Sequence, residues 1–263
     1  MTEGAAFDLV ISSAMDLQMK LANDGLARPH VSDATGTLPG WARWRDELFA
    51  LAQEPVVMVL RADAFQGLTL PRTRGDLVQV LRDAPERFRG RIGTYDPAAS
   101  GAGYLFATQD TRQSDTSWRL AEVMGSLEAR LYPTSGEMID AIKTGDLAVA
   151  YNVVGSYAAA RLADDAAGVL VEPQDFTHVL LRTALIPQSA PAPDRGAAVL
   201  DFLLSEAGQR VIEADSGLPR ISAAALADGP HLRPIRLDPG LLVFVDPLMR
   251  TQFLREWQAA VVQ

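Results

Sequence analysis

One local design recurs three times along the sequence: a short apolar run, a turn of small hydroxyl or glycine residues, and then a stretch with helical spacing. The apolar runs cover residues 7–11, 91–95 and 147–150. Short apolar runs bounded by turn signals predict buried strands, and strands that alternate with helices predict an α/β fold. We therefore expect an α/β protein built from successive strand–turn–helix units.

Several helices are marked by residues typical of their ends. Residues 134–137 read Thr-Ser-Gly-Glu and match the S/T-x-x-E capping box, which predicts a helix that ends at Gly145. Gly25 has the position of the residue that follows a helix over 15–21. A longer helix is predicted over 116–131.

Two later helices are predicted from apolar residues that recur on one face, which we expect to pack on the core. These residues are Val199, Phe202 and Leu203 in a helix over 195–204, and Met249, Phe253 and Trp257 in the last helix.

Composition excludes several classes of protein. The chain has 263 residues, of which 48% are hydrophobic, so it can bury a sizeable core. Its net charge of −9 argues against binding to the phosphate backbone of nucleic acids. Cysteine is absent, which excludes disulfides, thiolate metal sites and a cysteine nucleophile. No apolar run approaches the roughly 20 residues that span a bilayer.

The three strand–turn–helix junctions together predict a binding site. A helix N-terminus carries unpaired N–H groups and a partial positive charge, glycine lets a ligand approach the backbone, and serine adds a small donor. Ligands of open α/β sheets bind at the carboxyl ends of strands, where such junctions gather. Taken singly, each junction is equally consistent with an ordinary helix cap. The candidate ligand residues are Ser12, Ser13, Ser100, Gly101, Ala102, Ser135, Tyr151 and Asn152.

Catalytic and cofactor motifs are weak. The sequence contains no G-x-G-x-x-G, P-loop or G-x-S-x-G pattern, and no spacing of His, Asp and Glu that is typical of a metal site. We expect no catalytic residue, metal or cofactor, and no carboxylate partner for the three histidines His30, His178 and His231. An enzyme with a serine nucleophile stays open as an alternative, provided that a His or Lys lies beside that serine.

Four segments carry a family resemblance: residues 8–16 (DLVISSAMD), 96–104 (DPAASGAGY), 151–157 (YNVVGSY) and 198–209 (AVLDFLLSEAGQ). In this order they resemble the extracytoplasmic solute-binding proteins of ABC importers, which have the type II periplasmic-binding fold. The resemblance is to the branch that includes ferric-iron, phosphosugar and phosphoglycerate-type binding proteins. It covers nearly the whole chain.

The resemblance implies a two-lobed α/β fold of the type II periplasmic-binding-protein kind, with a hinge that closes on the ligand. The first lobe would comprise residues 1–61 and 178–263, and the second residues 62–177. The resemblance also implies that the first lobe is incomplete at its N-terminus, because the family's signal peptide, first strand and first helix have no counterpart here. Ser12 and Ser13 would contribute from the first lobe, and the other candidate residues from the second.

The resemblance also implies a function. The protein would capture a small anionic solute, such as a phosphorylated compound or an organic acid, and deliver it to an ABC permease from a periplasmic or extracytoplasmic location. Presentation of the solute to a membrane sensor kinase is an alternative. Ferric iron is another, although Tyr151-Asn152 stands where the iron binders typically carry adjacent tyrosines. A cytoplasmic sensing domain of a transcription regulator ranks lower, because no helix-turn-helix segment is evident.

Overall fold

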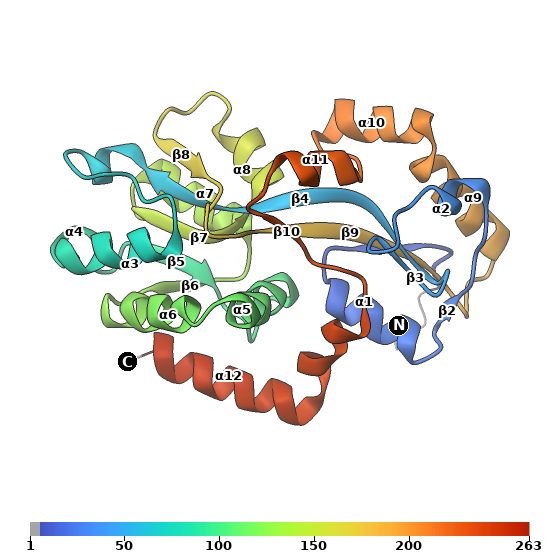
Figure 1. The fold of residues 1–263 in the computed structure, drawn as a ribbon, viewed down its shortest axis with the longest axis horizontal. Coiled ribbons are helices and arrows are strands. Elements are labelled where there is room, and N and C mark those ends of the chain that lie inside the picture. Colours follow the sequence, from blue (N-terminus) through green and yellow to red (C-terminus); the bar gives the residue numbers. More distant parts are fainter. Residues whose placement is uncertain (1–5, 263) are drawn as a thin grey trace. The chain divides into compact units, whose positions relative to one another are not determined.

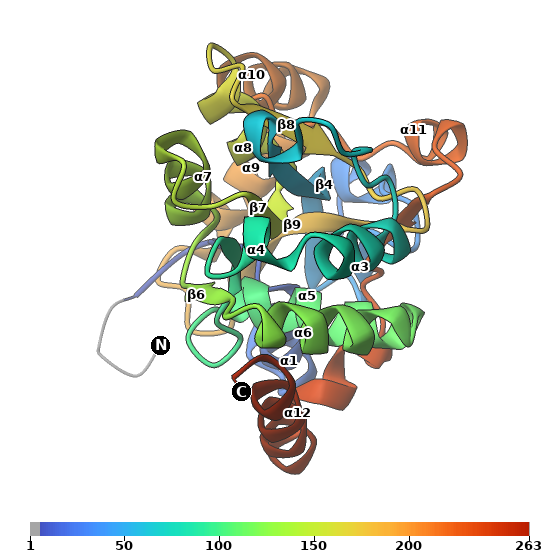
Figure 2. The same ribbon diagram turned by 90° about the vertical axis from the view of Figure 1, so that its left-hand side faces the viewer.

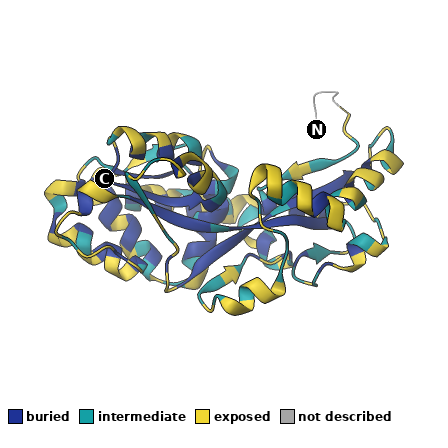
Figure 3. Cartoon of the chain, turned by 90° about the horizontal axis from the view of Figure 1, so that it is seen from above, coloured by how far each residue is buried: buried dark blue, intermediate teal, exposed yellow. Residues whose placement is uncertain are grey.

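The computed structural model describes residues 6–262, and its chain divides into two units. The first unit contains the chain up to Glu54 together with Leu180–Gly229 and Pro234–Asp246. The second contains Pro55–Val179, Pro230–Arg233 and the chain from Pro247 onwards. The chain first passes between the units within two long strands that are buried over most of their length, β4 (Leu48–Arg61) and β9 (Thr177–Pro187) (Figure 3). It passes between them again after Gly229, Arg233 and Asp246.

The lobes implied by the resemblance differ from these units chiefly in the last helix. Residues 178–263 were expected in the first lobe as one stretch, whereas α12 (Pro247–Val261) packs on α6 (Thr116–Ser126) and is part of the second unit (Figure 2). The helix α12 belongs to the second unit because its apolar side chains Phe253 and Trp257 are buried in that unit.

A mixed sheet forms the centre of the second unit. Its strands β5 (Ile92–Tyr95), β6 (Arg130–Tyr132) and β7 (Val149–Val154) run parallel, with β5 between the other two. The part of β4 in this unit pairs antiparallel with β7 and with β8 (Gly168–Val171). The apolar runs predicted over 91–95 and 147–150 therefore lie in strands of one sheet (Figure 1). The second strand differs from its prediction, because it starts at Val149 and includes residues 151–154, which were expected in the turn.

Helices cover this sheet and enclose the core of the second unit. The core contains Met58 and Leu60 of β4 and Leu77 and Leu81 of α3 (Arg74–Asp83), all of them fully buried. In chain order the helices are η1 (Ala62–Phe65), α3, α4 (Pro85–Phe88), α5 (Gly101–Gln113), α6, α7 (Ser135–Thr144), α8 (Gly155–Leu162) and α12.

The ends of α7 follow the capping prediction with one difference. The Thr134 hydroxyl accepts a hydrogen bond from the Glu137 amide at 3.2 Å, and Gly145 ends the helix with φ +86°. The Glu137 side chain does not return to the Thr134 amide. Instead it accepts a hydrogen bond from the Thr134 hydroxyl at 3.1 Å. The helix therefore begins and ends where the sequence predicts.

The first unit is built around β9, which pairs antiparallel with β1 (Val10–Ser12) and β2 (Ala27–Arg28). The strand expected over residues 7–11 starts later and is less buried than predicted, because Phe7 and Ile11 are each 49% exposed. The other elements are α1 (Met15–Asn23), α2 (Asp33–Gly36), β3 (Arg43–Trp44), α9 (Pro193–Leu204), α10 (Glu206–Ser216), α11 (Ala223–Asp228) and η2 (Pro239–Val245). The short strand β10 (Leu232–Pro234) pairs with β9, and its first two residues belong to the second unit.

Two sequence predictions about helices were wrong. The helix expected over 116–131 ends at Ser126, because Glu128 has φ +58° and the chain then enters β6. In α9, Val199 and Phe202 are about half exposed instead of buried. The helix turns its other face inward because Gly196 lies against the Asp8 carbonyl, where even a Cβ would come within 2.1 Å.

Candidate functional site

Three helices of the second unit begin at the same edge of its sheet. The chain leaves β5 and enters α5 at Gly101, leaves β6 and enters α7 at Ser135, and leaves β7 directly into α8 at Gly155 (Figure 1). Because the three strands are parallel, their carboxyl ends share one edge. This carboxyl edge therefore gathers three helix N-termini, which favour negatively charged groups.

The start of α5 leaves two backbone donors available. Ser100 caps the helix by accepting a hydrogen bond from the Gly103 amide at 3.2 Å. Among the described residues, the amides of Gly101 and Ala102 have no acceptor. Gly103 allows α5 to approach β5 closely, because a Cβ there would lie 2.4 Å from the Cβ of Tyr95.

A β-bulge in β7 places Tyr151 and Asn152. Val57 of the neighbouring strand β4 pairs with Val153, and Val59 pairs with Ala150. Tyr151 and Asn152 therefore stand opposite a single residue of β4, Met58. Asn152 adopts the left-handed conformation, with φ +62°. Adjacent side chains of a regular strand point to opposite faces. Here the bulge brings both side chains to one oxygen, Oδ2 of Asp110.

The carboxylate of Asp110, on α5, accepts hydrogen bonds from four side chains. Tyr151 Oη and Asn152 Nδ2 each donate to Oδ2 at 2.8 Å. Arg74 Nη2 and His178 Nε2 each lie 3.0 Å from Oδ1. Asp110 is 3% exposed and Arg74 1%, so this is a fully buried ionic network.

Arg74, at the start of α3, has partners on every side. Its Nε donates to the Tyr151 oxygen at 2.6 Å, and its Nη1 donates to the Phe176 carbonyl at 2.6 Å and to Asp175 at 3.2 Å. The guanidinium also lies 3.6 Å from the centre of the Phe176 ring. Such complete pairing is what allows a charged side chain to be buried.

The network fixes the protonation of its members. Burial alone would raise the pKa of Asp110, but the Arg74 charge and the hydrogen bonds from His178 and Asn152 outweigh it and hold that pKa well below its usual value. Burial also raises the pKa of the Tyr151 phenol, and Arg74 offsets this only in part, so the phenol stays protonated. Burial lowers the pKa of Arg74, but the Tyr151 oxygen and the charges of Asp110 and Asp175 raise it further than burial lowers it.

The candidate residues from the sequence fall into both units. Ser12 and Ser13 belong to the first unit, where the Ser12 hydroxyl accepts from the Ala14 amide at 3.0 Å and the Ser13 carbonyl accepts from the Met15 amide at 3.0 Å. The other candidates lie in the second unit, at or beside the carboxyl edge. Ser135 is 2% exposed, and its hydroxyl lies 2.5 Å from Tyr95 Oη and accepts from the Val154 amide at 3.0 Å.

Sequence reasoning missed Arg74 and Asp110 and misjudged the histidines. His178 pairs with Asp110, His30 lies 2.9 Å from Asp201, and His231 lies 3.1 Å from Glu172, so the expectation that they lack carboxylate partners was wrong. Each partner is far away in the sequence, and no motif links them. The one signal for Asp110 is that it is an acidic residue in an otherwise well-buried helix.

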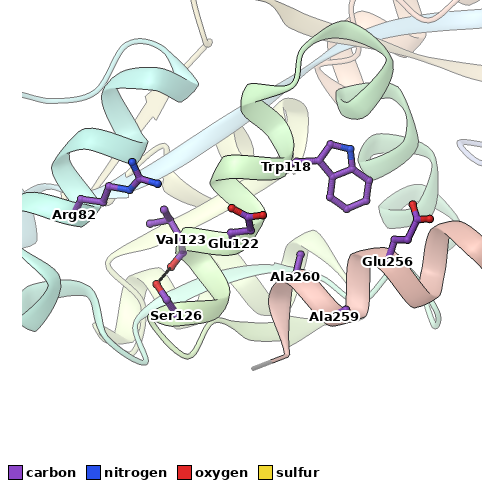
Figure 4. A pocket seen from close by; sticks show the side chains of 8 residues that line it. All are labelled: Arg82, Trp118, Glu122, Val123, Ser126, Glu256, Ala259 and Ala260. Atoms are coloured by element: carbon purple, nitrogen blue, oxygen red, sulfur yellow. Dashed lines mark hydrogen bonds between the residues drawn. The ribbon is translucent and has the colours of Figure 1, made fainter.

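A large open cavity in the second unit lies away from this chemistry. It has a volume of about 710 Å³ and is an open groove on α3, α6 and α12, lined by Trp118, Glu122 and Glu256 among others (Figure 4). None of its lining residues comes from the carboxyl edge. Asn152 instead lines a small cavity of about 30 Å³ together with Thr94, Asp110 and Tyr151.

Two further searches cover only the described part of the chain. No three His, Asp or Glu side chains there are grouped in a way that could hold a metal ion. No helix within residues 6–262 is long and apolar enough to cross a membrane.

Comparison with known proteins identifies the family. Residues 1–216 match the model of the bacterial extracellular solute-binding proteins. The chain belongs to this family. The substrate-binding protein of an ABC transporter from Agrobacterium tumefaciens is 33% identical, with a TM-score of 0.92 over 98% of this chain and 79% of that one. No curated protein matches the chain.

More distant solute-binding proteins share the fold. AfuA from Actinobacillus pleuropneumoniae, solved with fructose-6-phosphate bound, is 15% identical with a TM-score of 0.75, over 98% of this chain and 83% of that one. Iron-bound HitA from Pseudomonas aeruginosa is 18% identical with a TM-score of 0.69, over 96% of this chain and 82% of that one. This solute-binding protein therefore has the expected α/β fold of two-lobed periplasmic binding proteins, and it serves an ABC transporter, whose permease is its family's partner.

Proposed function

We propose that this solute-binding protein captures a small anion, a phosphorylated compound or an organic acid, through the carboxyl edge of β5, β6 and β7. The observation that carries the proposal is the start of three helices, α5, α7 and α8, at that one edge. Their N-terminal dipoles attract negative charge, and the amides of Gly101 and Ala102 have hydrogen bonds to offer. The solute would be taken up outside the cytoplasmic membrane and passed to the ABC permease.

The alternatives are less well supported. A ferric-iron site would call for phenolate ligands, but the Tyr151 phenol stays protonated and is occupied by Arg74 and Asp110. Delivery to a sensor kinase in place of a permease leaves the solute chemistry unchanged. Ser12 and Ser13 stay predictions as ligand residues. The Ser100 hydroxyl accepts from the Gly103 amide, which is the ordinary role of a capping serine, and the Ser12 hydroxyl accepts from the Ala14 amide within a turn.

Calorimetric titration with matched solutes tests the proposal. We expect fructose 6-phosphate or citrate to bind, and fructose, which has the same ring without the charge, to bind far more weakly. Equal affinity for fructose and fructose 6-phosphate, or binding of neither anion, would contradict the proposed anion site.

A pair of serine variants locates the site. Ser100 caps α5 and Ser205 caps α10 in the first unit, and each accepts from the third amide of its helix at 3.2 Å. Replacing either by alanine removes a cap worth about 1 kcal/mol. We expect only Ser100→Ala to weaken binding of the anion, and equal effects of Ser100→Ala and Ser205→Ala would place the site elsewhere.

A further inference from the structure

The two polar residues of the β7 bulge differ in what they can still bind. The Tyr151 oxygen donates to Asp110 and accepts from Arg74, so both of its hydrogen-bonding roles are filled inside the protein. Asn152 donates one N–H to Asp110. Its amide oxygen bonds to none of the described residues and is not among the buried polar atoms that lack a partner, so it remains open to solvent.

The backbone of Asn152 is held in the left-handed conformation, which costs free energy for a residue other than glycine. A non-glycine residue in the left-handed region is uncommon and is kept only where its surroundings enforce it. The one side-chain hydrogen bond of Asn152 among the described residues runs to Asp110 Oδ2, the same atom that holds Tyr151. Asp110 is itself fixed by Arg74 and His178, so the bulge is anchored to a carboxylate that cannot move.

We propose that Asp110 is a positioning residue for the solute site: it holds the β7 bulge so that the free amide oxygen of Asn152 faces the carboxyl edge and accepts a hydrogen bond from a hydroxyl group of the solute. Tyr151 is a brace between Arg74 and Asp110 and does not touch the solute. The inference rests on the proposed function, because it assumes that the solute sits at the edge where β7 ends.

Asp175 provides a matched control for Asp110. Both carboxylates pair with Arg74, at 3.0 Å for Asp110 and 3.2 Å for Asp175. Of these two carboxylates in the described part of the chain, only that of Asp110 is also hydrogen-bonded to Tyr151 and Asn152. Replacing either by asparagine removes one charge beside Arg74. Asp110 is more buried than Asp175, so the two substitutions are compared by the Asn152 side-chain signal and not by stability: a positioning role predicts that only Asp110→Asn changes this signal.

The sequence makes a direct readout possible, because the chain has two asparagines, Asn23 and Asn152. Asn23 is exposed at the end of α1 in the first unit and serves as an internal reference. In protein labelled with ¹⁵N-asparagine, we expect one side-chain N–H of Asn152 to be shifted downfield and protected from exchange. Asp175→Asn should keep this signal, and Asp110→Asn should lose it. The extra side-chain signal that either substitution introduces is identified by comparing the two variants.

Binding of fructose 6-phosphate or citrate supplies the functional readout. We expect a bound anion to shift the Asn152 signals and leave those of Asn23 in place. Asn152→Ala should weaken binding about tenfold, as the loss of a hydrogen bond to a hydroxyl group of the solute does. Tyr151→Phe should change affinity by less than about threefold, because it leaves the Asp110–Asn152 bond intact.

The outcomes separate the two proposals. If an anion binds but Asn152 does not respond, or if Tyr151→Phe weakens binding as much as Asn152→Ala, the positioning role is overturned while the function stands. If no anion binds, the proposed function fails, and the ligand-free signals of Asp110→Asn and Asp175→Asn still decide whether Asp110 holds Asn152. Should Asp110→Asn fail to fold, Tyr151→Phe, Asn152→Ala and Asp175→Asn keep the inference testable, since each leaves the Asp110 carboxylate in place.

Discussion

The buried carboxylate of Asp110 explains at the residue scale why a charged cluster can occupy the core of the second unit. Four donors surround its two oxygens, and the neighbouring Arg74 supplies the compensating charge. A buried charge without such partners would be strongly destabilising. The sequence indicated Tyr151 and Asn152 as polar residues after an apolar run. It could not indicate Asp110 or Arg74, because these residues lie on the helices α5 and α3, far from β7 in the sequence, and meet Tyr151 and Asn152 only in the folded chain.

The pKa of Asp110 predicts how stability depends on pH. Because this pKa is lowered in the folded protein, Asp110 stabilises the fold above its unfolded-state pKa of about 3.9, and the stabilisation is lost as the pH falls toward the folded-state pKa. In Asp110→Asn this dependence is absent. We expect the difference in free energy of unfolding between wild type and Asp110→Asn to shrink by up to about 1.4 kcal/mol per pH unit below about pH 4.

Urea unfolding of both proteins between about pH 7 and about pH 3 measures this difference. A difference that stays constant across the whole range would show that Asp110 is not more acidic in the folded state than in the unfolded state.

Gln18 of α1 is a second residue-scale feature, with a predicted cost. The side chain is 2% exposed, and within residues 6–262 neither its amide nitrogen nor its amide oxygen has a hydrogen-bond partner. Each buried unsatisfied group costs about 1–3 kcal/mol, whereas an apolar side chain of similar shape carries no such cost. We therefore expect Gln18→Met to raise the free energy of unfolding by about 1–2 kcal/mol.

Chemical unfolding at neutral pH measures the effect of Gln18→Met. The matched control is Gln258→Met, the same substitution at an exposed position of α12, which should change stability by less than about 0.5 kcal/mol. A destabilised Gln18→Met would mean that the buried amide has a role that methionine cannot fill.

At the scale of elements, close helix packing in the second unit depends on a single glycine. A Cβ at Gly125 of α6 would lie 2.2 Å from the Ala260 carbonyl oxygen and 2.9 Å from the Val261 Cα on α12. The sequence predicted both helices, but it gave α6 five extra residues, because the left-handed residue Glu128 and the short strand β6 leave no clear periodic signal. Local pattern therefore identified the elements better than it identified their ends.

Gly125→Ala should consequently force α12 away from α6. Overpacking of this kind costs about 1–3 kcal/mol, and contact with backbone atoms places Gly125 at the upper end of that range. Thermal or chemical unfolding measures the loss. Gly75→Ala in α3 is the control, because its nearest neighbour would be 3.6 Å away, and we expect it to be neutral or slightly stabilising. Equal effects at the two positions would rule out the packing explanation.

At the scale of the whole molecule, each unit is assembled from segments that are distant in the sequence. The last helix shows this clearly, because α12 follows Asp246 of the first unit and yet belongs to the second. Phe253 of α12 packs against two aromatic residues of the second unit: its ring centre lies 5.5 Å from that of Tyr104 and 5.9 Å from that of Trp118. The sequence predicted that Phe253 and Trp257 face a core but could not tell which core.

We expect Phe253→Ala to destabilise the second unit by about 3–5 kcal/mol, the usual cost of emptying a buried phenylalanine site. In ¹⁵N-asparagine-labelled protein under increasing urea, the Asn152 signal should change at lower denaturant than in wild type, while the change at Asn23 shifts less. Val262→Ala, at a position that is 56% exposed, is the control. A larger shift at Asn23 than at Asn152 would place α12 with the first unit.

The sequence by itself determined the alternation of strands and helices, the caps of α7, and the three junctions at which α1, α5 and α8 begin. These features are local, because capping, turn conformation and apolar periodicity act between residues a few positions apart. Tertiary structure alone decided that β5, β6 and β7 bring the starts of α5, α7 and α8 to one edge while the α1 junction belongs to the first unit, that α12 packs on α6, and that Arg74, Asp110 and His178 surround Tyr151 and Asn152. The hydrogen bonds of this network join residues between 36 and 77 positions apart, and the burial that makes them strong exists only once the chain has folded.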